Sequence, residues 1–472
     1  MSRSGIVCTI GPATCTAGAL AAMRAAGMTV ARLNGSHSDL DWHASAIALL
    51  RQTVPDVPIL LDIPGRKIRT GALAVEPTFA AGDRIVLTTD PSHDGSREVP
   101  VNYVNLHEDL SPGNVILADD GTLRFTVVEI RGKSIVCRAD CAGRLKSRKG
   151  INVPFVKLRT AMVTDRDRKM VDFAKRHGVD YIGISFVESG EHVDRIRALI
   201  EGSWPRIVSK VENQGGLDNL EAVIAATDAV MIDRGDLSVE TQLETIALDQ
   251  KRVLDAARKH GKPVIVATEM LHTMIDNPFP TKAEVSDITN AVLDGCAATM
   301  LSGETAIGAH YVKAVETMRI VADRASAFLK EGQQPRGEAR SVPQAMEDAV
   351  ALICRELPIT KIVAVTISGY AARMISARRP RQPILAVSND PMTTRAMNLY
   401  YGTTGYHIDI PFSRTSTDHV VHCLESLWRR GALVDDDLIL VTSVGYPRSG
   451  NRMNLIQTHA VADLAGTLGW KR

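Results

Sequence analysis

The chain has 472 residues, an apolar fraction of 45% and a charged fraction of 23%, which is the composition of a soluble globular protein with several domains. Lys plus Arg total 55 against 54 for Asp plus Glu, and aromatic residues make up 4%, so we expect no nucleic-acid partner. The sequence lacks the long apolar run that a membrane span or a secretory signal would need. We therefore expect a cytoplasmic protein without a membrane partner. The seven scattered cysteines predict free thiols in a reducing compartment.

Apolar runs rich in β-branched residues alternate with amphipathic helical stretches along much of the chain. Continuous apolar runs are typical of parallel strands that are buried on both faces. Helical patterns, such as those of residues 16–27 and 165–178, lie between these runs. Eight strand–helix units predict a (β/α)8 barrel. The predicted strands are residues 5–11, 28–36, 57–63, 179–186, 206–213, 228–236, 263–270 and 297–304.

Two further regions interrupt or follow the barrel pattern. Between the third and fourth strands, short strands alternate with turn residues, which predicts an inserted small β-barrel lid domain. After residue 330, a polar stretch at 329–342 predicts a linker, and the strands and helices beyond it predict a separate α/β domain. The predicted domains are a catalytic barrel of 1–71 and 155–330, a lid of 72–154 and a C-terminal domain of 343–472.

Polar residues directly follow the apolar runs of four predicted barrel strands. Active sites of such barrels lie at the C-terminal ends of the strands, and side chains two residues apart on a strand point the same way. For any single pair, a solvated loop residue or a structural ion pair is an equally good interpretation, but four strands with the same pattern favour a site. The residues are Arg32, Asn34 and Ser36, then Lys210 and Glu212, then Arg234 and Asp236, and finally Ser302 and Glu304.

Lys210 is the residue of this group that is hardest to explain structurally. It lies within the apolar run that contains Val208 and Val211, and a buried ammonium without a partner is costly. Glu212 and Asp236 could supply two carboxylates to one Mg2+, which typically binds one or two carboxylates together with substrate oxygens.

Six segments resemble, in order, the signature segments of the pyruvate kinase family. These are VCTIGPAT (7–14), ARLNGSH (31–37), SKVEN (209–213), RGDL (234–237), ATEML (267–271) and LSGETA (301–306). KIRTG (67–71), LADDG (117–121) and SRKGIN (147–152) match the family at the lid. The resemblance implies transfer of a phosphoryl group from phosphoenolpyruvate to ADP, giving pyruvate and ATP in glycolysis.

The resemblance also implies a role for each matching residue. Glu212 and Asp236 would bind Mg2+ or Mn2+, and Lys210 would neutralise charge on the phosphoryl group and the enolate. Thr268 and Ser302 would lie where the family passes a proton to the enolate carbon. Substrate binding would involve Arg32, Lys210, Arg234, Gly235, Asp236 and Thr268. ADP-side contacts would come from His37, Arg69 and Lys149, and monovalent-cation ligands from Asn34, Ser36 and Asp62. For Asn34 and Ser36, a simple turn-forming role is the alternative.

Position 67 departs from the family pattern in a way that has a direct physical interpretation. The usual glutamate is Lys67 here, and the usual cation-binding threonine is Ile63. An ammonium near the phosphate can replace a bound K+ ion, and an apolar side chain cannot ligate one. We therefore expect activity that does not need K+. The alternative is that Lys67 is an exposed loop residue without a role.

Two acidic residues that the family pattern lacks leave the identity of the substrate undecided. The small residue that precedes RGD in the family is Asp233, and the family glutamine of ATQML is Glu269. A negative charge near the substrate carboxylate should repel it, unless Asp233 pairs with Arg234 or Lys67, or binds a substrate that has an extra polar group. The alternatives are a divergent enzyme that acts on another 2-oxo acid or enol phosphate, and a non-catalytic regulatory paralogue. The paralogue is disfavoured because the catalytic residues are all present.

Effector binding and assembly are implied by the resemblance alone. TISGYAARMISARRP (366–380) keeps a Ser/Gly loop before a helix, which suits a phosphorylated effector. The second effector loop of the family is altered to SVGYPRSG (443–450). The family implies a homotetramer, although Lys282 stands where an interface arginine is usual.

Overall fold

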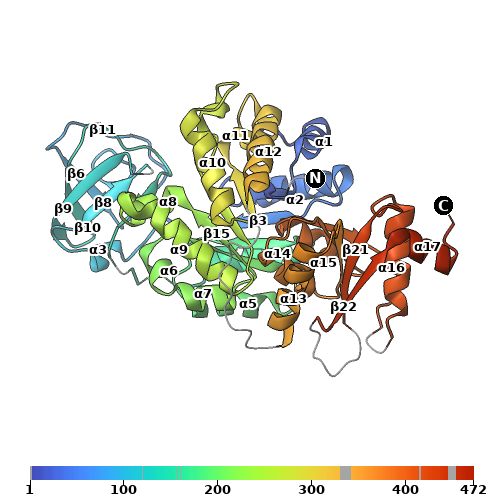
Figure 1. Ribbon diagram of the computed structural model, residues 1–472. Coiled ribbons are helices and arrows are strands. Elements are labelled where there is room, and N and C mark those ends of the chain that lie inside the picture. The colour runs from blue at the N-terminus through green and yellow to red at the C-terminus, as the bar shows by residue number, and fades with distance from the viewer. Residues whose placement is uncertain are drawn as a thin grey trace.

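The computed structural model describes residues 3–119, 121–156, 158–159, 161–329, 342–413, 416–444 and 453–471. Most of the predicted linker and most of the altered loop at 443–450 lie outside these residues. Three regions follow one another in space (Figure 1): the strand-rich lid at one end, the barrel in the middle and the C-terminal α/β domain at the other end. The predicted barrel, strand-rich lid and C-terminal α/β domain are confirmed.

Eight parallel strands close into the barrel in the order β1-β17-β16-β15-β14-β13-β3-β2. All eight predicted strands are present, and each is shorter than its predicted run. The strands are β1 (Gly5–Thr9), β2 (Val30–Asn34), β3 (Ile59–Ile63), β13 (Tyr181–Ile184), β14 (Arg206–Val211), β15 (Ala229–Asp233), β16 (Val264–Ala267) and β17 (Ala298–Leu301).

Several of the barrel helices begin at short polar side chains that cap them. Thr164 and Thr281 each form a capping box with the acidic residue three positions on, which satisfies two N–H groups at the helix start. The helices are α1 (Ala17–Ala26), α2 (Leu40–Thr53), α4 (Asp165–Arg176), α5 (Gly190–Ile200), α6 (Gln214–Asp218), α7 (Leu220–Ala226), α8 (Arg234–Glu240), α9 (Ile246–Lys259), α10 (Lys282–Asp294), α11 (Gly303–Ala306) and α12 (Tyr311–Phe328), with short turns η1 (Leu243–Thr245) and η2 (His272–Ile275).

Alternation along the strands divides the barrel core into two parts. One set of residues packs between the strands and the helices, for example Ile59, Leu61 and Ile63 of β3. The other set, which includes Leu60 of β3 and Val208 of β14, fills the barrel interior. Since side chains two apart share a face, the residues that follow these inner positions towards the strand ends also point inward.

The lid is built on a seven-stranded sheet of order β4-β12-β8-β9-β10-β6-β7 and a two-stranded ribbon, β11-β5. The four longer strands match predicted runs, whereas the two- and three-residue strands and the short helix α3 (Leu106–Asp109) were not predicted. Strands β4 and β12 pair where the chain enters and leaves the lid, with Gly150 opposite Arg69. The strands are β4 (Ile68–Arg69), β5 (Thr78–Phe79), β6 (Arg84–Thr88), β7 (Val99–Pro100), β8 (Val115–Ala118), β9 (Leu123–Arg131), β10 (Ser134–Ala139), β11 (Gly143–Arg144) and β12 (Gly150–Asn152).

The C-terminal domain is a five-stranded sheet of order β20-β19-β18-β21-β22 with helices on its faces. Three of the five strands were predicted. The two edge strands, β20 and the antiparallel β22, were not predicted. The elements are α13 (Val342–Glu356), β18 (Lys361–Val365), α14 (Tyr370–Ala377), β19 (Ile384–Ser388), α15 (Pro391–Ala396), η3 (Met397–Leu399), β20 (Thr403–His407), α16 (Asp418–Arg429), β21 (Leu438–Ser443), β22 (Leu455–Ala460) and α17 (Val461–Leu468).

Specific polar contacts attach the C-terminal domain to the end of the barrel where the strands begin. This end is opposite to the carboxyl ends of the strands. The Tyr181 hydroxyl donates to the carbonyl oxygen of Ala396 at 2.8 Å, and Arg395 pairs with Asp180 at 2.9 Å.

All seven cysteines are free thiols. In the described part of the chain, the helices are too short or too polar to cross a lipid bilayer.

Candidate active site

The carboxyl ends of the barrel strands gather seven ionisable side chains, which we call the charged cluster. They are brought together because each follows an inward-facing apolar residue on its strand or lies in the loop just after a strand. Strands β2, β3, β14 and β15, the loop after β3 and the start of α8 supply them. The charged cluster consists of Arg32, Asp62, Lys67, Lys210, Glu212, Asp233 and Asp236.

Lys210 lies at the centre of the charged cluster. Its ammonium lies 3.0 Å from a carboxylate oxygen of Glu212, 3.0 Å from Asp233 and 3.5 Å from Asp62, and it donates to the Ser185 hydroxyl at 3.3 Å. Burial would lower the pKa of Lys210, but Asp62, Glu212 and Asp233 hold it well above its ordinary value. The side chain is therefore a permanent buried cation, able to stabilise negative charge that develops beside it.

Arg32 and Asp62 form a buried ion pair on neighbouring strands. The Asp62 Oδ2 atom accepts from Arg32 Nη2 at 2.6 Å and from Nε at 3.1 Å, while Arg32 Nη1 donates to the Thr9 hydroxyl at 3.0 Å. The other oxygen, Asp62 Oδ1, is buried and has no hydrogen-bond donor. The guanidinium is thus fixed at the end of β2, and one buried carboxylate oxygen remains available to a cation.

Three carboxylates converge as metal ligands would. One oxygen from each of Glu212, Asp233 and Asp236 lies within 4.8 Å of the others. Glu212 accepts the backbone N–H of Phe186 on Oε1 at 2.7 Å, whereas Oε2 is buried without a hydrogen-bond donor, although the ammonium of Lys210 is nearby. This oxygen-only set suits Mg2+ or Mn2+. The predicted ligands Glu212 and Asp236 therefore come together, and Asp233 joins them.

Ionisation of two of these carboxylates, Glu212 and Asp236, is opposed by their surroundings, because burial raises the pKa of each. Burial raises the pKa of Glu212, with Asp233 and Asp236 adding to the effect of burial. Burial and Asp233 likewise raise the pKa of Asp236, although Lys67 opposes the rise. Burial would also raise the pKa of Asp233, but Lys210 and Lys67 hold it below its ordinary value. Carboxylates that resist ionisation in this way are expected to gain most from a bound cation.

Lys67 is part of the charged cluster and not an exposed loop lysine. Its ammonium lies 2.5 Å from Asp236 Oδ1, and its side chain is 14% exposed. Asp233 pairs with Lys210, with Lys67 near enough to lower its pKa. Of the two partners considered for Asp233, Arg234 is excluded, because it pairs with Asp287 of α10 at 2.7 Å.

The ionised groups of the charged cluster leave a small negative excess. Three are cationic, namely Arg32, Lys67 and Lys210, and four are acidic, which leaves one excess negative charge when all are ionised. Buried charges are stable only when they are balanced by partners. One excess negative charge favours binding of a divalent cation. The charged cluster with that cation bound would then have one excess positive charge, which favours binding of an anionic substrate.

A short polar loop after β16 faces the start of α8. The Gly235 N–H donates to the Thr268 hydroxyl at 2.8 Å, and that hydroxyl donates to the carbonyl oxygen of Ala267 at 2.5 Å. Thr268 has a φ of +70°, a backbone conformation that costs a β-branched residue energy and is concentrated at functional sites. Arg234 donates to the carbonyl oxygen of Thr268 at 2.7 Å, so it holds this loop in place.

Ser302 and Glu269 occupy different environments at the same end of the barrel. The Ser302 N–H donates to Glu304 at 2.7 Å, and the buried Glu304 also accepts the Leu271 N–H at 3.0 Å. This carboxylate ties together the loops that follow β16 and β17. Glu269 is exposed and contributes no ion pair within the described residues, so the added charge that matters to the site is Asp233.

The remaining predicted residues lie around the entrance. Asn34 accepts the Ser36 N–H at 3.1 Å, which is the turn-forming contact expected under the alternative interpretation. Desolvation lowers the pKa of His37, and the positive charge of Arg69 adds to this effect. Lys149 pairs with Asp119 inside the lid at 2.7 Å.

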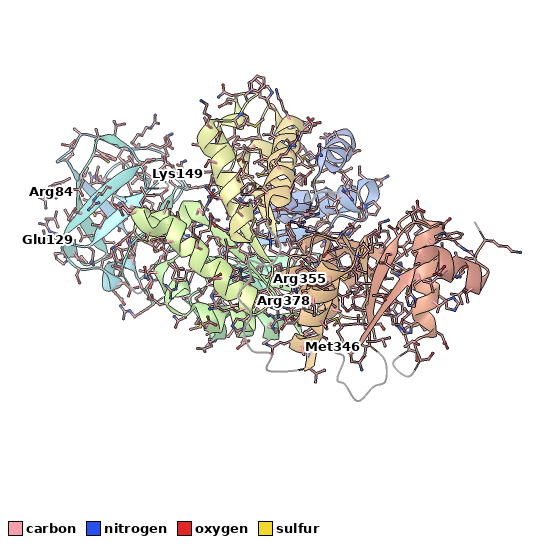
Figure 2. The ribbon with its side chains drawn as sticks, viewed as in Figure 1. Arg84, Glu129, Lys149, Met346, Arg355 and Arg378 are labelled. Atoms are coloured by element: carbon pink, nitrogen blue, oxygen red, sulfur yellow. The ribbon has the colours of Figure 1, made fainter. Side chains whose placement is uncertain are left out.

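The lid residues separate into two groups (Figure 2). Lys149 lies on the side of the lid nearer the barrel, whereas Arg84 and Glu129 lie at its far edge. At the base of the lid, Asn152 donates to Glu240 of α8 at 2.7 Å. This lid-to-barrel bond was not predicted, because no sequence pattern connects residues 88 positions apart.

Comparisons with known proteins agree with this geometry. The model of the family "Pyruvate kinase, barrel domain" matches residues 1–315, and that of "Pyruvate kinase, alpha/beta domain" matches residues 344–459. The pyruvate kinase of Bacillus licheniformis is 37% identical, covering 98% of this chain and 81% of that protein. The pyruvate kinase of Mycobacterium intracellulare is 36% identical, with 98% and 99% covered. The crystal structure of a pyruvate kinase from Cryptosporidium parvum superposes with a TM-score of 0.88 at 31% identity, covering 98% of this chain and 96% of that one.

The fold and these matches define the class of protein as a phosphotransferase built on a lidded barrel. The matched segments span both the barrel and the C-terminal domain, and the identity extends over almost the whole chain. The chain belongs to the pyruvate kinase family.

Proposed function

We propose that this chain transfers a phosphoryl group between phosphoenolpyruvate and ADP with the help of Mg2+ or Mn2+ and without K+. The observation that carries the proposal is the charged cluster. Lys210, Glu212 and Asp236 meet at the strand ends in the register that the family resemblance requires, and Lys67 reaches the same point. Positioning and charge neutralisation are most of what phosphoryl transfer needs.

In the proposed reaction, Glu212 and Asp236 hold the divalent cation, with Asp233 within reach of it. When bound, this ion supplies positive charge to the oxygens of the phosphoryl group and of the enolate. Lys210 stabilises the negative charge that shifts between these oxygens, and Arg32 holds the phosphate. His37, Arg69 and Lys149 lie on the nucleotide side, where closure of the lid would exclude water.

Thr268 would act at the carboxylate end of the substrate. In the structure, the Thr268 hydroxyl donates its proton to the carbonyl oxygen of Ala267. The same hydroxyl oxygen accepts a hydrogen bond from the N–H of Gly235. A substrate carboxylate that took over the Gly235 and Asp236 N–H groups would free the hydroxyl. Together with Ser302 at the end of β17, Thr268 would then place a proton near the enolate carbon.

Independence from K+ is supported by a count of charges. In the family pattern, a glutamate at position 67 together with a bound K+ contributes no net charge, whereas Lys67 contributes one positive charge. Asp233 adds one negative charge 3.0 Å from Lys210, which restores the balance. Ile63 is fully buried against the barrel helices and offers no oxygen from its side chain. Asn34, Ser36 and Asp62 would therefore lack the remainder of a K+ site.

A coupled assay tests this proposal. Pyruvate formation from phosphoenolpyruvate and ADP is measured with Mg2+, with Na+ or Tris as the other cation and then with K+. We expect turnover of similar rate in both, and none in the Lys210→Met variant. Turnover that requires K+ would reject K+ independence, and no turnover in either buffer would reject phosphoenolpyruvate as substrate.

A second candidate is an enzyme of the same family that acts on another 2-oxo acid or enol phosphate. It is favoured by one observation, the carboxylate of Asp233 beside Lys210, since this carboxylate competes with a substrate anion for the ammonium. If the coupled assay is negative, binding of a panel of 2-oxo acids to the Mn2+-loaded protein would identify the substrate class. A non-catalytic paralogue would bind none of them.

Assembly, control and location remain part of the proposal. A homotetramer acting in glycolysis in the cytoplasm is the arrangement that the family suggests. The loop before α14, with Gly369 in the left-handed conformation at the helix start, is a candidate for a phosphorylated effector. Sedimentation of the purified chain and titration with sugar phosphates would test these points.

A further inference from the structure

The loop that carries Lys67 leaves the barrel and enters the lid within a few residues. Strand β3 ends at Ile63, and the first strand of the lid sheet, β4, begins at Ile68. Lys67 therefore directly precedes the lid, although its ammonium belongs to the charged cluster, 2.5 Å from Asp236 Oδ1. When the lid closes over the nucleotide, as proposed above, the chain on one side of Lys67 moves relative to the barrel. The ammonium keeps its place only if the loop before Lys67 is fixed to the barrel.

An ion pair one residue before Lys67 fixes this loop. Arg66 Nη2 lies 2.7 Å from Glu188 Oε2, and the same nitrogen donates to the carbonyl oxygen of Phe186 at 3.4 Å. The Arg66 side chain is 9% exposed and that of Glu188 is 39% exposed, so water and salt screen this pair only in part. Glu188 lies on the barrel, in the loop between β13 and α5. The pair therefore joins the loop after β3 to a part of the barrel that does not move with the lid.

Two backbone contacts support the same attachment. The Ser185 hydroxyl donates to the carbonyl oxygen of Ile63 at 2.8 Å. Gly65 has a φ of +58°, and a Cβ atom at this position would lie 2.7 Å from the carbonyl oxygen of Ser185, so the close approach requires glycine. The loop that leads to Lys67 thus lies directly against the end of β13 and the loop that follows it.

Glu188 is itself held in place by α6 and the residue that follows this helix. The side-chain amide of Asn219 donates to the carbonyl oxygen of Glu188 at 2.9 Å. Position 215 of α6 is a glycine, and a Cβ atom there would lie 2.8 Å from Glu188 Cγ. The side chain of Glu188 therefore lies tightly against α6, and its carboxylate is a fixed partner for Arg66.

The segment that Arg66 contacts also touches the charged cluster. The Phe186 N–H donates to Glu212 Oε1 at 2.7 Å, and the Lys67 ammonium lies 5.8 Å from the centre of the Phe186 ring, within the range of a cation–π contact. On the lid side, the stem of Lys67 lies against Gly150 of β12, where a Cβ atom would come within 3.0 Å of it. Lys67 is thus contacted by both barrel and lid. Because the lid contacts change on closure, the barrel contacts must set where the ammonium lies.

We infer that Arg66, through its ion pair with Glu188, is a positioning residue that holds Lys67 against Asp236 while the lid moves. The inference rests on the proposed function for its effect on turnover, whereas the position of the ammonium can be measured without substrate. Arg66 acts through Lys67, whose flexible four-carbon stem does not fix the ammonium by itself. A pair with its charges exchanged should hold the loop equally well, since the attraction does not depend on which position carries which sign.

Competitive acetylation of the full-length chain with acetic anhydride, followed by mass spectrometry, tests this inference. The measured quantity is the acetylation rate of Lys67 relative to that of the exposed Lys133 in the same protein, at one pH and without substrate or metal. An ammonium that is held against a carboxylate reacts slowly. We expect Arg66→Ala to raise the relative rate about fivefold, which is the scale of a partly exposed ion pair. Arg66→Glu, which places a like charge opposite Glu188, should raise it further.

A matched control separates this ion pair from ion pairs in general. Arg195→Ala removes an arginine whose distance to Glu191 is also 2.7 Å, on the exposed face of α5. This variant should change the relative acetylation rate of Lys67 by less than about twofold, because a surface pair contributes little beyond its own helix.

A double variant separates the ion pair from general damage to the loop. Arg66→Glu combined with Glu188→Arg should return the acetylation rate of Lys67 to the native value, and should restore the kcat that Arg66→Ala lowers in the coupled assay. Unchanged acetylation in both single Arg66 variants would overturn the inference, as would a rise that the double variant does not reverse. Raised acetylation with native kcat would overturn the role of Arg66 in turnover. If the native chain showed no turnover but acetylation changed as expected, the proposed function would be rejected and the positioning of Lys67 supported.

Discussion

The two ends of the barrel both bury cations, but they balance them differently. At the strand ends, Lys210 has three carboxylates within 3.5 Å. At the opposite end, Lys262, Arg373 and Arg379 are held by carbonyl oxygens and have no carboxylate partner among the described residues. The first arrangement leaves a negative excess that suits a metal ion, whereas the second leaves a positive excess. The partners of a buried cation, and not the cation itself, decide the net charge of its site.

The largest effect should follow from removal of the central cation at the strand ends. Lys210→Met should lower kcat by about a thousandfold, because it removes stabilisation that is strongest in the transition state. It also leaves buried carboxylates unbalanced, which should cost on the order of 3 kcal/mol of unfolding free energy. Added Mg2+ should restore part of this stability. Assays and thermal unfolding with and without Mg2+ would check this, and a variant with native kcat would contradict the assigned role.

Reversal of the charge at position 67 should produce the next largest effect. Lys67→Glu places a carboxylate beside Asp236 and Asp233, and we expect activity in Na+ buffer to fall about a hundredfold. Combining it with Asp233→Ala and Ile63→Thr should make activity depend on K+. The control is Lys133→Glu, on an exposed turn of the lid. If the triple variant showed no response to K+, the charge-balance explanation would be wrong.

A smaller effect should follow from neutralising the third carboxylate. Asp233→Asn removes one negative charge from the convergent oxygens, and the affinity for Mn2+ should fall about tenfold. Titration of free Mn2+ by electron paramagnetic resonance measures this without reference to activity. The exposed Glu269→Gln variant, also an acid-to-amide change at this end of the barrel, should bind Mn2+ as the native chain does. Equal affinity in all three proteins would exclude Asp233 as a ligand.

The smallest effect concerns a partly buried carboxylate that has no ion-pair partner among the described residues. Burial raises the pKa of Glu240 from 4.5 to about 7. Between these values the folded chain binds more protons than the unfolded chain, so this group makes stability fall as pH rises, by about 1–3 kcal/mol in total. Glu240→Gln should remove that part of the pH dependence, whereas Glu269→Gln should not. Urea unfolding at pH 5 and pH 7.5 measures the difference.

The barrel could be predicted because its pattern is local. Eight apolar runs separated by helical stretches are visible in the sequence, and the alternation of side chains predicted that Lys210 and Glu212 point the same way, as do Arg32 and Asn34. The edge strands β20 and β22 were missed because their residues are only partly buried and lack a continuous apolar run. The shortest lid strands were missed because two residues carry no periodicity.

The site could be predicted in part. The strand-end pattern and the resemblance together identified six of the seven residues of the charged cluster as site residues, and Asp233 as a change near the substrate. The ion-pair partners considered for Asp233 were Arg234 and Lys67, whereas the structure shows Lys210 as its partner. Adjacent residues in a chain leave a strand in different directions, so Arg234 contacts α10 while Asp233 faces the barrel interior.

The sequence by itself therefore determined the order of the elements, the inward face of each strand and the residues that carry charge there. These follow from side-chain alternation and from the cost of burying a charge, which are properties of short segments. Only the tertiary structure decided which charges neutralise one another. Asp233 and Lys210 are 3.0 Å apart although 23 positions separate them, and Arg379 reaches the carbonyl oxygen of Cys296 across 83 positions. Electrostatic balance depends on distance in space, and that distance is set by how the barrel closes and how the C-terminal domain packs against it.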